Sequence, residues 1–148
     1  MMAVFELKPI GVVHSQFKSR EEIANSNKDE NVGTIEISSD YANGLDDIDG
    51  FSHIIIICWM HKSTYHSLKV RPIYHPEKLR GIFATRHPDR PNPIAITVLE
   101  LLERKENILK VKGIDLLDGT PVLDIKPYTR RDRKDNAEFG WLSEKKYP

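Results

Sequence analysis

A dense set of directional side chains lies in one short stretch, FATRHPDRPNPI, at residues 83–94. Its three prolines each fix φ, lack a backbone donor and bias the preceding residue toward extended geometry. The stretch is therefore a stiff loop that holds Arg86, Arg90 and Asn92 with little freedom left to lose. Such a loop suits a ligand site, because its ordering cost is met at folding rather than at binding. The alternative is a rigid surface connection with both arginines in water.

A second polar stretch, GIDLLDGTPVLDIKPY, occupies residues 113–128. Within it, Asp118-Gly119-Thr120-Pro121 is a turn signal. Asp hydrogen-bonds its own backbone, Gly supplies a positive φ and Pro restarts an extended segment. Other polar side chains of the stretch are Asp115, Asp124, Lys126 and Tyr128. Two rigid segments rich in arginine and carboxylate indicate a site rather than two incidental turns.

Short β-strands must position these loops. Strand patterns cover residues 10–14, 32–38, 53–59, 94–102, 108–114 and 122–125. The continuous apolar run at 53–59 is typical of a strand buried on both faces, and the polar residues 103–107 predict a hairpin turn. Residues 18–31 read as a loop, and 41–45 or 77–80 as a helical turn. Many short strands separated by Pro and Gly predict an all-β barrel or sandwich.

The bulk properties predict one domain and no membrane span. A length of 148 residues fits a single domain, and no apolar run is long enough to cross a bilayer. The N-terminus lacks the pattern of a signal peptide. The single cysteine, Cys58, lies in the apolar run and is expected to pack as a small buried hydrophobe. One cysteine forms no internal disulfide, which is compatible with the cytoplasmic location that we expect.

The formal net charge is zero, which is unusual for a nucleic-acid binder. The charge is nevertheless patterned. A basic cluster comprises Lys126, Arg130, Arg131, Arg133 and Lys134, and an acidic cluster comprises Asp46, Asp47 and Asp49. The basic cluster is either an RNA-binding patch or a solvated tail.

Several common sites are absent from the sequence. It contains no G-x-G-x-x-G, no G-x-x-x-x-G-K-[ST] and no G-x-S-x-G, so a doubly wound nucleotide-binding domain is not expected. Cys58-x-x-His61 has a ligand-like spacing, with His66 and His75 nearby. No second close pair completes a zinc set, so packing or surface histidines explain the pattern and we expect no metal.

The two long motifs, together with PIGVVHSQF at 9–17 and GLDDIDGFSHIIIICWMHK at 44–62, resemble the TsaA/TrmO-like family in the same order. The similarity runs from about residue 8 to about residue 128. The family comprises S-adenosylmethionine-dependent tRNA methyltransferases with a β-barrel core. The resemblance therefore implies a single compact β-barrel domain over residues 1–148, with few short helices and a short C-terminal extension.

Carried over position by position, the resemblance implies a cofactor site for S-adenosyl-L-methionine. Its residues would be His61, Lys62, Arg86, Asp118, Gly119, Thr120 and Pro121. Arg86 could bind the cofactor carboxylate through a bidentate pair. Asp115, Asp118 and His61 are the candidates for a catalytic base.

The expected substrate-binding residues are Arg90, Asn92, Lys126 and Tyr128. Lys126 and Tyr128 would serve as phosphate and base-stacking partners. The alternative for Lys126 is a plain ion pair with Asp124 on one strand face.

The resemblance implies N6-methylation of threonylcarbamoyladenosine beside the tRNA anticodon, by a homodimer with its sites near the interface. Two other functions stay open. One is a non-catalytic barrel that binds S-adenosylmethionine or RNA, and the other is a methyltransferase with a different acceptor, because acceptor choice depends on loop geometry.

Overall fold

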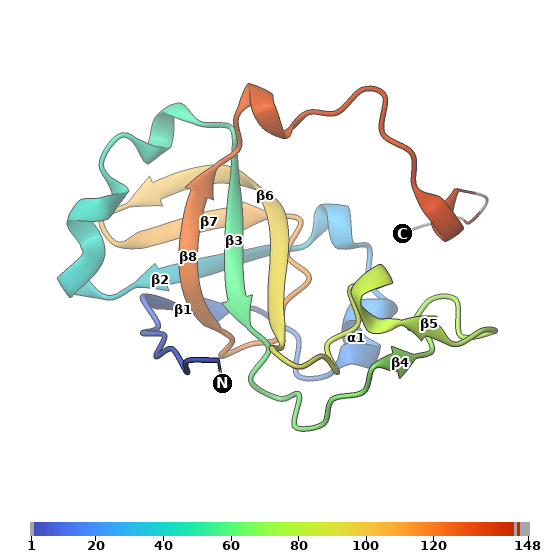
Figure 1. Cartoon of the computed structure of the whole chain (residues 1–148). Coiled ribbons are helices and arrows are strands. Elements are labelled where there is room, and N and C mark those ends of the chain that lie inside the picture. The colour runs from blue at the N-terminus through green and yellow to red at the C-terminus, as the bar shows by residue number, and fades with distance from the viewer. Residues whose placement is uncertain (1, 144, 146–148) are drawn as a thin grey trace.

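The fold is a closed antiparallel β-barrel, seen in a computed structural model that describes residues 2–143 and 145 (Figure 1). Its strands are β1 (Gly11–His14), β2 (Val32–Ile37), β3 (His53–Trp59), β6 (Ile94–Lys105), β7 (Ile108–Lys112) and β8 (Pro121–Pro127). Around the barrel the order is β1-β2-β7-β6-β3-β8, and β8 pairs with β1 to close it. Closure leaves no unpaired barrel edge. The all-β barrel expected from the motifs is confirmed.

The barrel interior is filled by alternate residues of each strand. On β3 these are Ile54, Ile56 and Cys58, all with no exposed surface. The intervening β3 residues lie on the outer face, where Ile55, Ile57 and Trp59 are half-buried and His53 is exposed. The expectation that residues 53–59 are buried on both faces is therefore wrong in detail, because only the inner face is covered.

Strand direction gathers three long connections at one end of the barrel, called here the mouth. β1, β3 and β7 end there, and β2, β6 and β8 begin there, as the pairings Trp59 with Ile94 and Lys112 with Val32 show. The connections are residues 15–31, 60–93 and 113–120. The β2–β3 connection and the β6–β7 hairpin lie at the opposite end.

The mouth connections carry short elements of their own. Residues 60–93 contain the hairpin of β4 (Lys69–Val70) and β5 (Arg80–Gly81), followed by the 3-10 helix η4 (Ile82–Ala84). Residues 15–31 contain α1 (Arg20–Ala24) and η1 (Lys28–Glu30), whereas the sequence predicted a loop. The missed signal is Ser19-x-x-Glu22, because the Ser19 hydroxyl caps α1 by accepting from the Glu22 backbone N–H at 3.3 Å.

The remaining elements are 3-10 helices. The β2–β3 connection forms η2 (Ser39–Leu45) and η3 (Ile48–Gly50), where the sequence predicted a turn of helix at 41–45; the other candidate, 77–80, forms none.

Residues 103–105, predicted to be part of a turn, extend β6 instead. They pair with β7 after a β-bulge, and a turn at Glu106 and Asn107 is enough to join the strands.

After β8 the chain leaves the barrel as an arm. The arm carries η5 (Arg130–Asp132) and η6 (Gly140–Leu142), and its residues 128–140 are all exposed (Figure 1). It arches from the far end of β8 toward the β4–β5 hairpin, where Trp141 contacts the protein. The short C-terminal extension that the resemblance implies thus carries η6, while residues 144 and 146–148 lie outside the described part.

Within residues 2–143 and 145, no helix has the length and apolar character needed to cross a membrane. In the same part of the chain, no group of three His, Cys, Asp or Glu side chains has an arrangement that could hold a metal ion.

Candidate active site

The turn predicted at Asp118–Pro121 lies at the mouth and is held rigidly against β1. The Asp118 backbone N–H donates to the Phe17 carbonyl, and that of Gly119 donates to the Val13 carbonyl, both at 2.8 Å. Gly119 has φ of 82°, a value that a side chain would strain. The Thr120 hydroxyl donates to the Leu117 carbonyl at 2.6 Å and the residue is only 3% exposed, so its side chain stabilises the turn itself.

Both carboxylate oxygens of Asp118 have partners. Oδ1 accepts from the Ser15 backbone N–H at 3.0 Å, and Oδ2 accepts from Lys18 Nζ at 2.7 Å. The Lys18 hydrogen bond, helped by that of Ser15, lowers the pKa of Asp118. An acceptor with a lowered pKa is poorly matched to general-base work near neutral pH. Asp118 is suited instead to fixing the turn and to binding a cationic or hydroxyl group.

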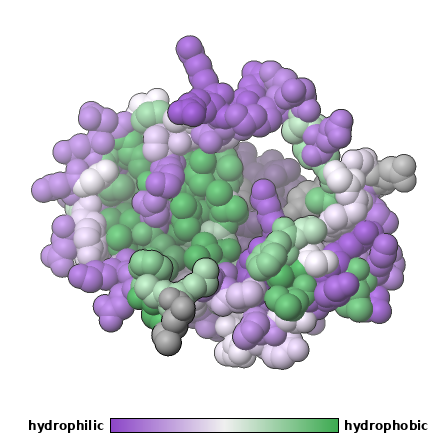
Figure 2. Space-filling model, in the orientation of Figure 1, coloured by the Kyte–Doolittle hydropathy of each residue, from purple (hydrophilic) through white to green (hydrophobic). Residues whose placement is uncertain are grey.

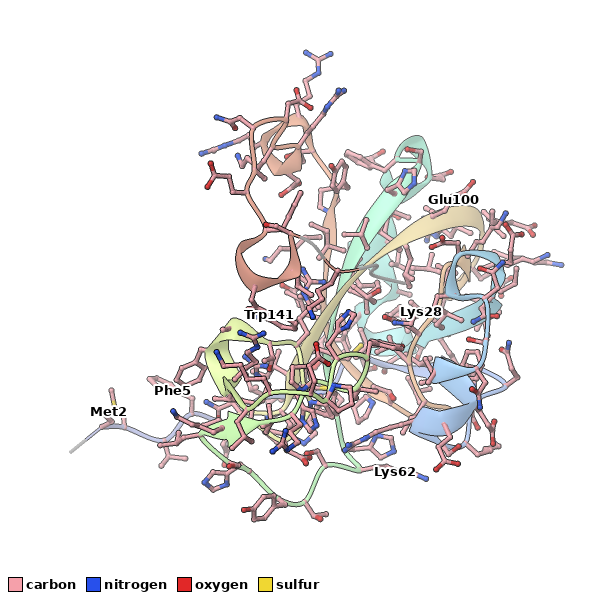
Figure 3. All side chains as sticks on the ribbon, turned by 90° about the vertical axis from the view of Figure 1, so that its right-hand side faces the viewer. Met2, Phe5, Lys28, Lys62, Glu100 and Trp141 are labelled. Atoms are coloured by element: carbon pink, nitrogen blue, oxygen red, sulfur yellow. The ribbon has the colours of Figure 1, made fainter. Side chains whose placement is uncertain are left out.

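His61 follows β3 and lies beside the turn. A Cβ placed on Gly119 would be 3.9 Å from His61 Nε2, so the imidazole faces this glycine. His61 Nδ1 is enclosed and has no hydrogen-bond partner among the described residues. Burial and then the Lys62 charge lower the pKa of His61, which keeps the ring neutral near pH 7. Lys62 itself is exposed and points outward (Figure 3).

Asp115 is the most enclosed carboxylate of the mouth. Its Oδ1 is buried without a hydrogen-bond partner in the described residues, and the Thr97 side chain of β6 hydrogen-bonds the carboxylate. Burial raises the pKa of Asp115, and the nearby charges of Lys28 and Arg86 oppose the rise. A desolvated carboxylate with an unused oxygen, beside two cations, is a common arrangement at functional sites.

Cys58 lies inside the barrel near Asp115. Burial, with a smaller effect of the Asp115 charge, raises the pKa of the Cys58 thiol to about 12. The thiol therefore stays protonated, and the prediction of a small buried hydrophobe is confirmed.

The proline-rich loop is held in shape by Arg90. Arg90 Nη1 donates to the carbonyls of Thr85 at 2.9 Å and His87 at 3.1 Å, so this nitrogen is used within the loop. Arg90 thereby fixes the backbone on either side of Arg86. Arg86 is exposed and close enough to Asp115 to influence its pKa, and Asn92 is exposed just before β6.

Contacts from residues 15–31 join the mouth connections to one another. Arg20 lies 3.4 Å from Asp89 of the proline-rich loop, and the Lys28 ammonium lies 4.5 Å from the centre of the Tyr74 ring. Lys18 reaches Asp118, as described above. Sequence reasoning missed these three basic residues, because it read residues 18–31 as a loop and the contacts are made to distant parts of the chain.

Lys126 and Tyr128 lie away from the mouth. They follow β8 to the opposite end of the barrel, where the Tyr128 backbone N–H donates to the His53 carbonyl at 3.2 Å. Lys126 Nζ is 2.9 Å from Asp124 Oδ2, the ion pair that the sequence analysis left open. Within one chain, the structure therefore does not bring these two residues to the other candidates.

The chain is thus a closed β-barrel whose loops gather polar and charged side chains at one end. A family model described as the tRNA-methyltransferase O N-terminal domain matches residues 12–133. The chain belongs to this family, and the resemblance read from its motifs is confirmed.

Curated relatives carry two kinds of name. A probable S-adenosyl-L-methionine-binding protein of Pyrococcus abyssi is 48% identical over 139 residues, covering 91% of this chain and 74% of the relative. An S-adenosyl-L-methionine-binding protein of Archaeoglobus fulgidus is 46% identical over 124 residues, covering 83% and 88%. The tRNA (adenine(37)-N6)-methyltransferase of Escherichia coli is 35% identical over 141 residues, covering 86% of this chain and 59% of the enzyme.

Solved structures show the same fold. A crystal structure of TrmO superposes with a TM-score of 0.79 at 34% identity, covering 93% of this chain and 64% of that one. TrmO from Pseudomonas aeruginosa gives a TM-score of 0.78 at 30% identity, covering 94% and 63%. This chain thus spans a little under two thirds of the TrmO chains of known structure.

Proposed function

We propose that this protein is an S-adenosyl-L-methionine-dependent tRNA methyltransferase that acts on the adenosine beside the anticodon. The observation that carries the proposal is the mouth itself. It brings His61, Asp115 and Arg86 together with the rigid Asp118–Pro121 turn, in a family whose relatives are named for S-adenosyl-L-methionine binding and for adenine methylation in tRNA.

The mouth residues fit the chemical groups of the cofactor. Arg86 supplies a planar guanidinium that can hold the carboxylate of the cofactor in a bidentate pair. The Asp118 carboxylate and the carbonyls of the turn offer acceptors for an amine, a ribose or an adenine edge, while the N–H groups of Asp118, Gly119 and Thr120 are used within the fold. When bound, the cofactor supplies an activated methyl group, and the residues supply alignment and electrostatics.

The reaction forms a nitrogen–methyl bond and breaks the sulfonium–methyl bond, which leaves a neutral thioether. The acceptor nitrogen loses its proton to a base. His61 is neutral and Asp115 has a raised pKa, and each keeps one enclosed, unpartnered atom in the described structure. Both are therefore better matched to this role than Asp118, whose oxygens are occupied.

We further propose that the acceptor is N6 of threonylcarbamoyladenosine, as the resemblance to the family implies. A tRNA acceptor implies a cytoplasmic location. In this proposal Arg90 and Asn92 lie on the acceptor side of the mouth, whereas Lys126 and Tyr128 can reach RNA only from the far end of the barrel or from a second subunit.

A second copy of the chain is the proposed partner. The outer faces of β3 and β6 form an apolar patch of Ile55, Ile57, Trp59, Ile94, Ile96 and Val98, in directly paired positions. Ile96 is 51% and Val98 48% exposed. Figure 2 shows hydrophobic side chains gathered on this side of the barrel. Because the patch ends at the mouth, a copy docked on it would lie beside the site.

A methyl-transfer assay tests the function. The protein is incubated with labelled S-adenosyl-L-methionine and total tRNA, with and without the threonylcarbamoyl group, and the nucleosides are analysed by mass spectrometry. We expect a methylated adenosine whose formation depends on that group. Cofactor binding without any methylated nucleoside would instead favour a binding module.

The proposed ion pair between Arg86 and the cofactor carboxylate is tested separately. We expect Arg86→Ala to weaken S-adenosyl-L-methionine binding by about tenfold or more, as for loss of a charge-assisted bidentate pair. Calorimetry measures the affinity. The control is Lys105→Ala, which removes an exposed cation from the β6–β7 hairpin at the other end of the barrel. Unchanged affinity in Arg86→Ala would refute the pair.

A further inference from the structure

Charge is distributed unevenly over this molecule, although its total is zero. Residues 60–93, called here the basic lobe, contain seven Lys and Arg residues but only two acidic residues, Glu77 and Asp89. With His neutral, the lobe carries +5 and the rest of the chain −5. At the opposite end of the barrel, residues 38–52 hold four Asp and no Lys or Arg. The lobe therefore carries a surplus of positive charge that attracts a polyanion to the mouth side, and the basic cluster of Lys126, Arg130, Arg131, Arg133 and Lys134 is a second, separate cationic region at the far end of β8.

The two acids of the lobe are already paired with cations from outside it. Glu77 accepts from Lys145 Nζ of the arm at 2.6 Å, and Asp89 lies 3.4 Å from Arg20 of α1. Neither acid therefore neutralises the lobe's own lysines and arginines. Lys62, Lys69 and Lys78 are all exposed, so their charges are available to a ligand.

The basic lobe also exposes aromatic rings. Phe83 is 76% and Tyr65 is 69% exposed, values that are hard to explain by packing. Exposed aromatic rings beside cations suit unpaired nucleotides, because every base can stack on a ring while its phosphate meets a cation. A protein partner of ordinary composition would not require this surplus of positive charge.

Phe83 is held on a fixed backbone close to the site. It lies in η4, three residues before Arg86, and the carbonyl of the next residue, Ala84, accepts from Trp141 Nε1 at 2.8 Å. In Figure 3, Trp141 lies on the arm next to this part of the lobe. A ring presented in this way loses little freedom on stacking, which favours binding.

We propose that the basic lobe is the surface that docks the unpaired loop of a tRNA, with Phe83 as a base-stacking platform and Lys69 and Lys78 as phosphate contacts. This surface deepens the proposed function and rests on it, because it carries the RNA strand that presents its base to the mouth. The hairpin of β4 and β5, which bears Lys69, lies beside the mouth in Figure 1.

The test measures tRNA affinity by fluorescence anisotropy over a series of salt concentrations, with calorimetry of S-adenosyl-L-methionine binding in parallel. We expect Phe83→Ala to weaken tRNA binding by about fivefold or more, as for the loss of one stacked base. We expect Phe83→Trp to keep wild-type affinity and Phe83→Leu to lose affinity as Phe83→Ala does. The reason is that base stacking needs an aromatic ring and not only a large side chain. The double variant Lys69→Ala/Lys78→Ala lowers the salt slope by up to about two.

Matched controls lie elsewhere on the molecule. Phe5→Ala removes a ring that is 83% exposed, and Lys105→Ala/Lys110→Ala removes two exposed cations of the β6–β7 hairpin. We expect both controls to keep wild-type affinity for tRNA, and all variants to keep wild-type affinity for the cofactor.

Three results would overturn the assignment in distinguishable ways. If the wild type methylates tRNA but the lobe variants bind it normally, the function stands and the surface is wrong. If the controls and the lobe variants lose tRNA affinity equally, tRNA is bound by general charge attraction over the whole surface, and the basic lobe is not the docking surface. If the wild type binds the cofactor but neither binds nor methylates tRNA, the tRNA acceptor and the surface fail together.

Discussion

His61 shows how a local environment sets the chemistry of one side chain. Its ring is partly enclosed beside Gly119 and next to the charge of Lys62, and both effects disfavour the imidazolium. A neutral ring at the mouth can accept a proton, which a charged ring cannot. The same shift makes the folded protein bind this proton more weakly than the unfolded chain does.

We therefore expect the pKa of His61, followed by NMR, to lie below its ordinary value of 6.5 in the folded protein and to return to it in denaturant. Acidification from neutral pH then favours unfolding, because the unfolded chain takes up the proton first. If His61 is the base, methyl transfer falls on the acid side as the ring charges. A folded-state pKa at or above 6.5 would contradict this account.

Cys58 gives a simple measure of burial at the same scale. A thiol with no exposed surface and a pKa of about 12 has almost no thiolate at neutral pH. We expect no reaction with an aromatic disulfide reagent in the native state and one thiol per chain after unfolding. Rapid labelling of the native protein would mean that the barrel interior near Asp115 opens readily.

At the scale of elements, the arm acts as a strap across the molecule. The arm leaves β8 at the end of the barrel opposite the mouth. The contacts that bring it back to the rest of the protein are made by residues near its C-terminal end. Trp141 lies 4.7 Å from the Arg80 guanidinium and donates to Ala84, and its ring meets His75 edge-on at 6.1 Å. Through these contacts Trp141 ties the arm to the hairpin that precedes the Arg86 loop.

We expect Trp141→Ala to release the strap, because it removes a cation–π contact and a hydrogen bond worth together about 1–3 kcal/mol. Hydrogen exchange should accelerate in residues 79–86, and cofactor affinity should fall several-fold as Arg86 loses its support. Trp141→Phe, which keeps a ring but not the N–H, should lie in between. Glu138→Ala, an exposed arm residue, serves as the control, and no change in exchange for Trp141→Ala would exclude the strap.

At the scale of the whole molecule, the apolar patch on β3 and β6 is the contact surface of the proposed dimer. Its side chains are too exposed and too contiguous for a solvated barrel face, and covering them would remove a substantial apolar area from water. The patch lies next to the mouth, so assembly and activity are coupled in the proposed dimer.

We expect light scattering to give the mass of two chains for the wild type and of one chain for Ile96→Lys, because a buried lysine on each side of a two-fold interface is costly. Val32→Lys changes a residue that is 43% exposed on β2, outside the patch, and should stay dimeric. A monomeric wild type would refute the dimer.

The six barrel strands and the turn at Asp118–Pro121 were predictable from the sequence. Apolar, β-branched runs and Pro or Gly turn residues act locally, so their effect is visible in the residues themselves. The long proline-rich motif was likewise enough to indicate a rigid loop, and together with the three other motifs it indicated the family by resemblance. The capping signal at Ser19 was also present in the sequence, although it was read as part of a loop.

The tertiary structure alone decided which of these residues meet. Strand direction and closure place the connections after β1, β3 and β7 at one end, which joins Lys18 to Asp118 and brings Arg86 near Asp115. The same closure sends Lys126 and Tyr128 to the other end. Contacts between distant residues, and the burial that shifts their pKa values, depend on register and packing across the whole barrel, which no local pattern contains.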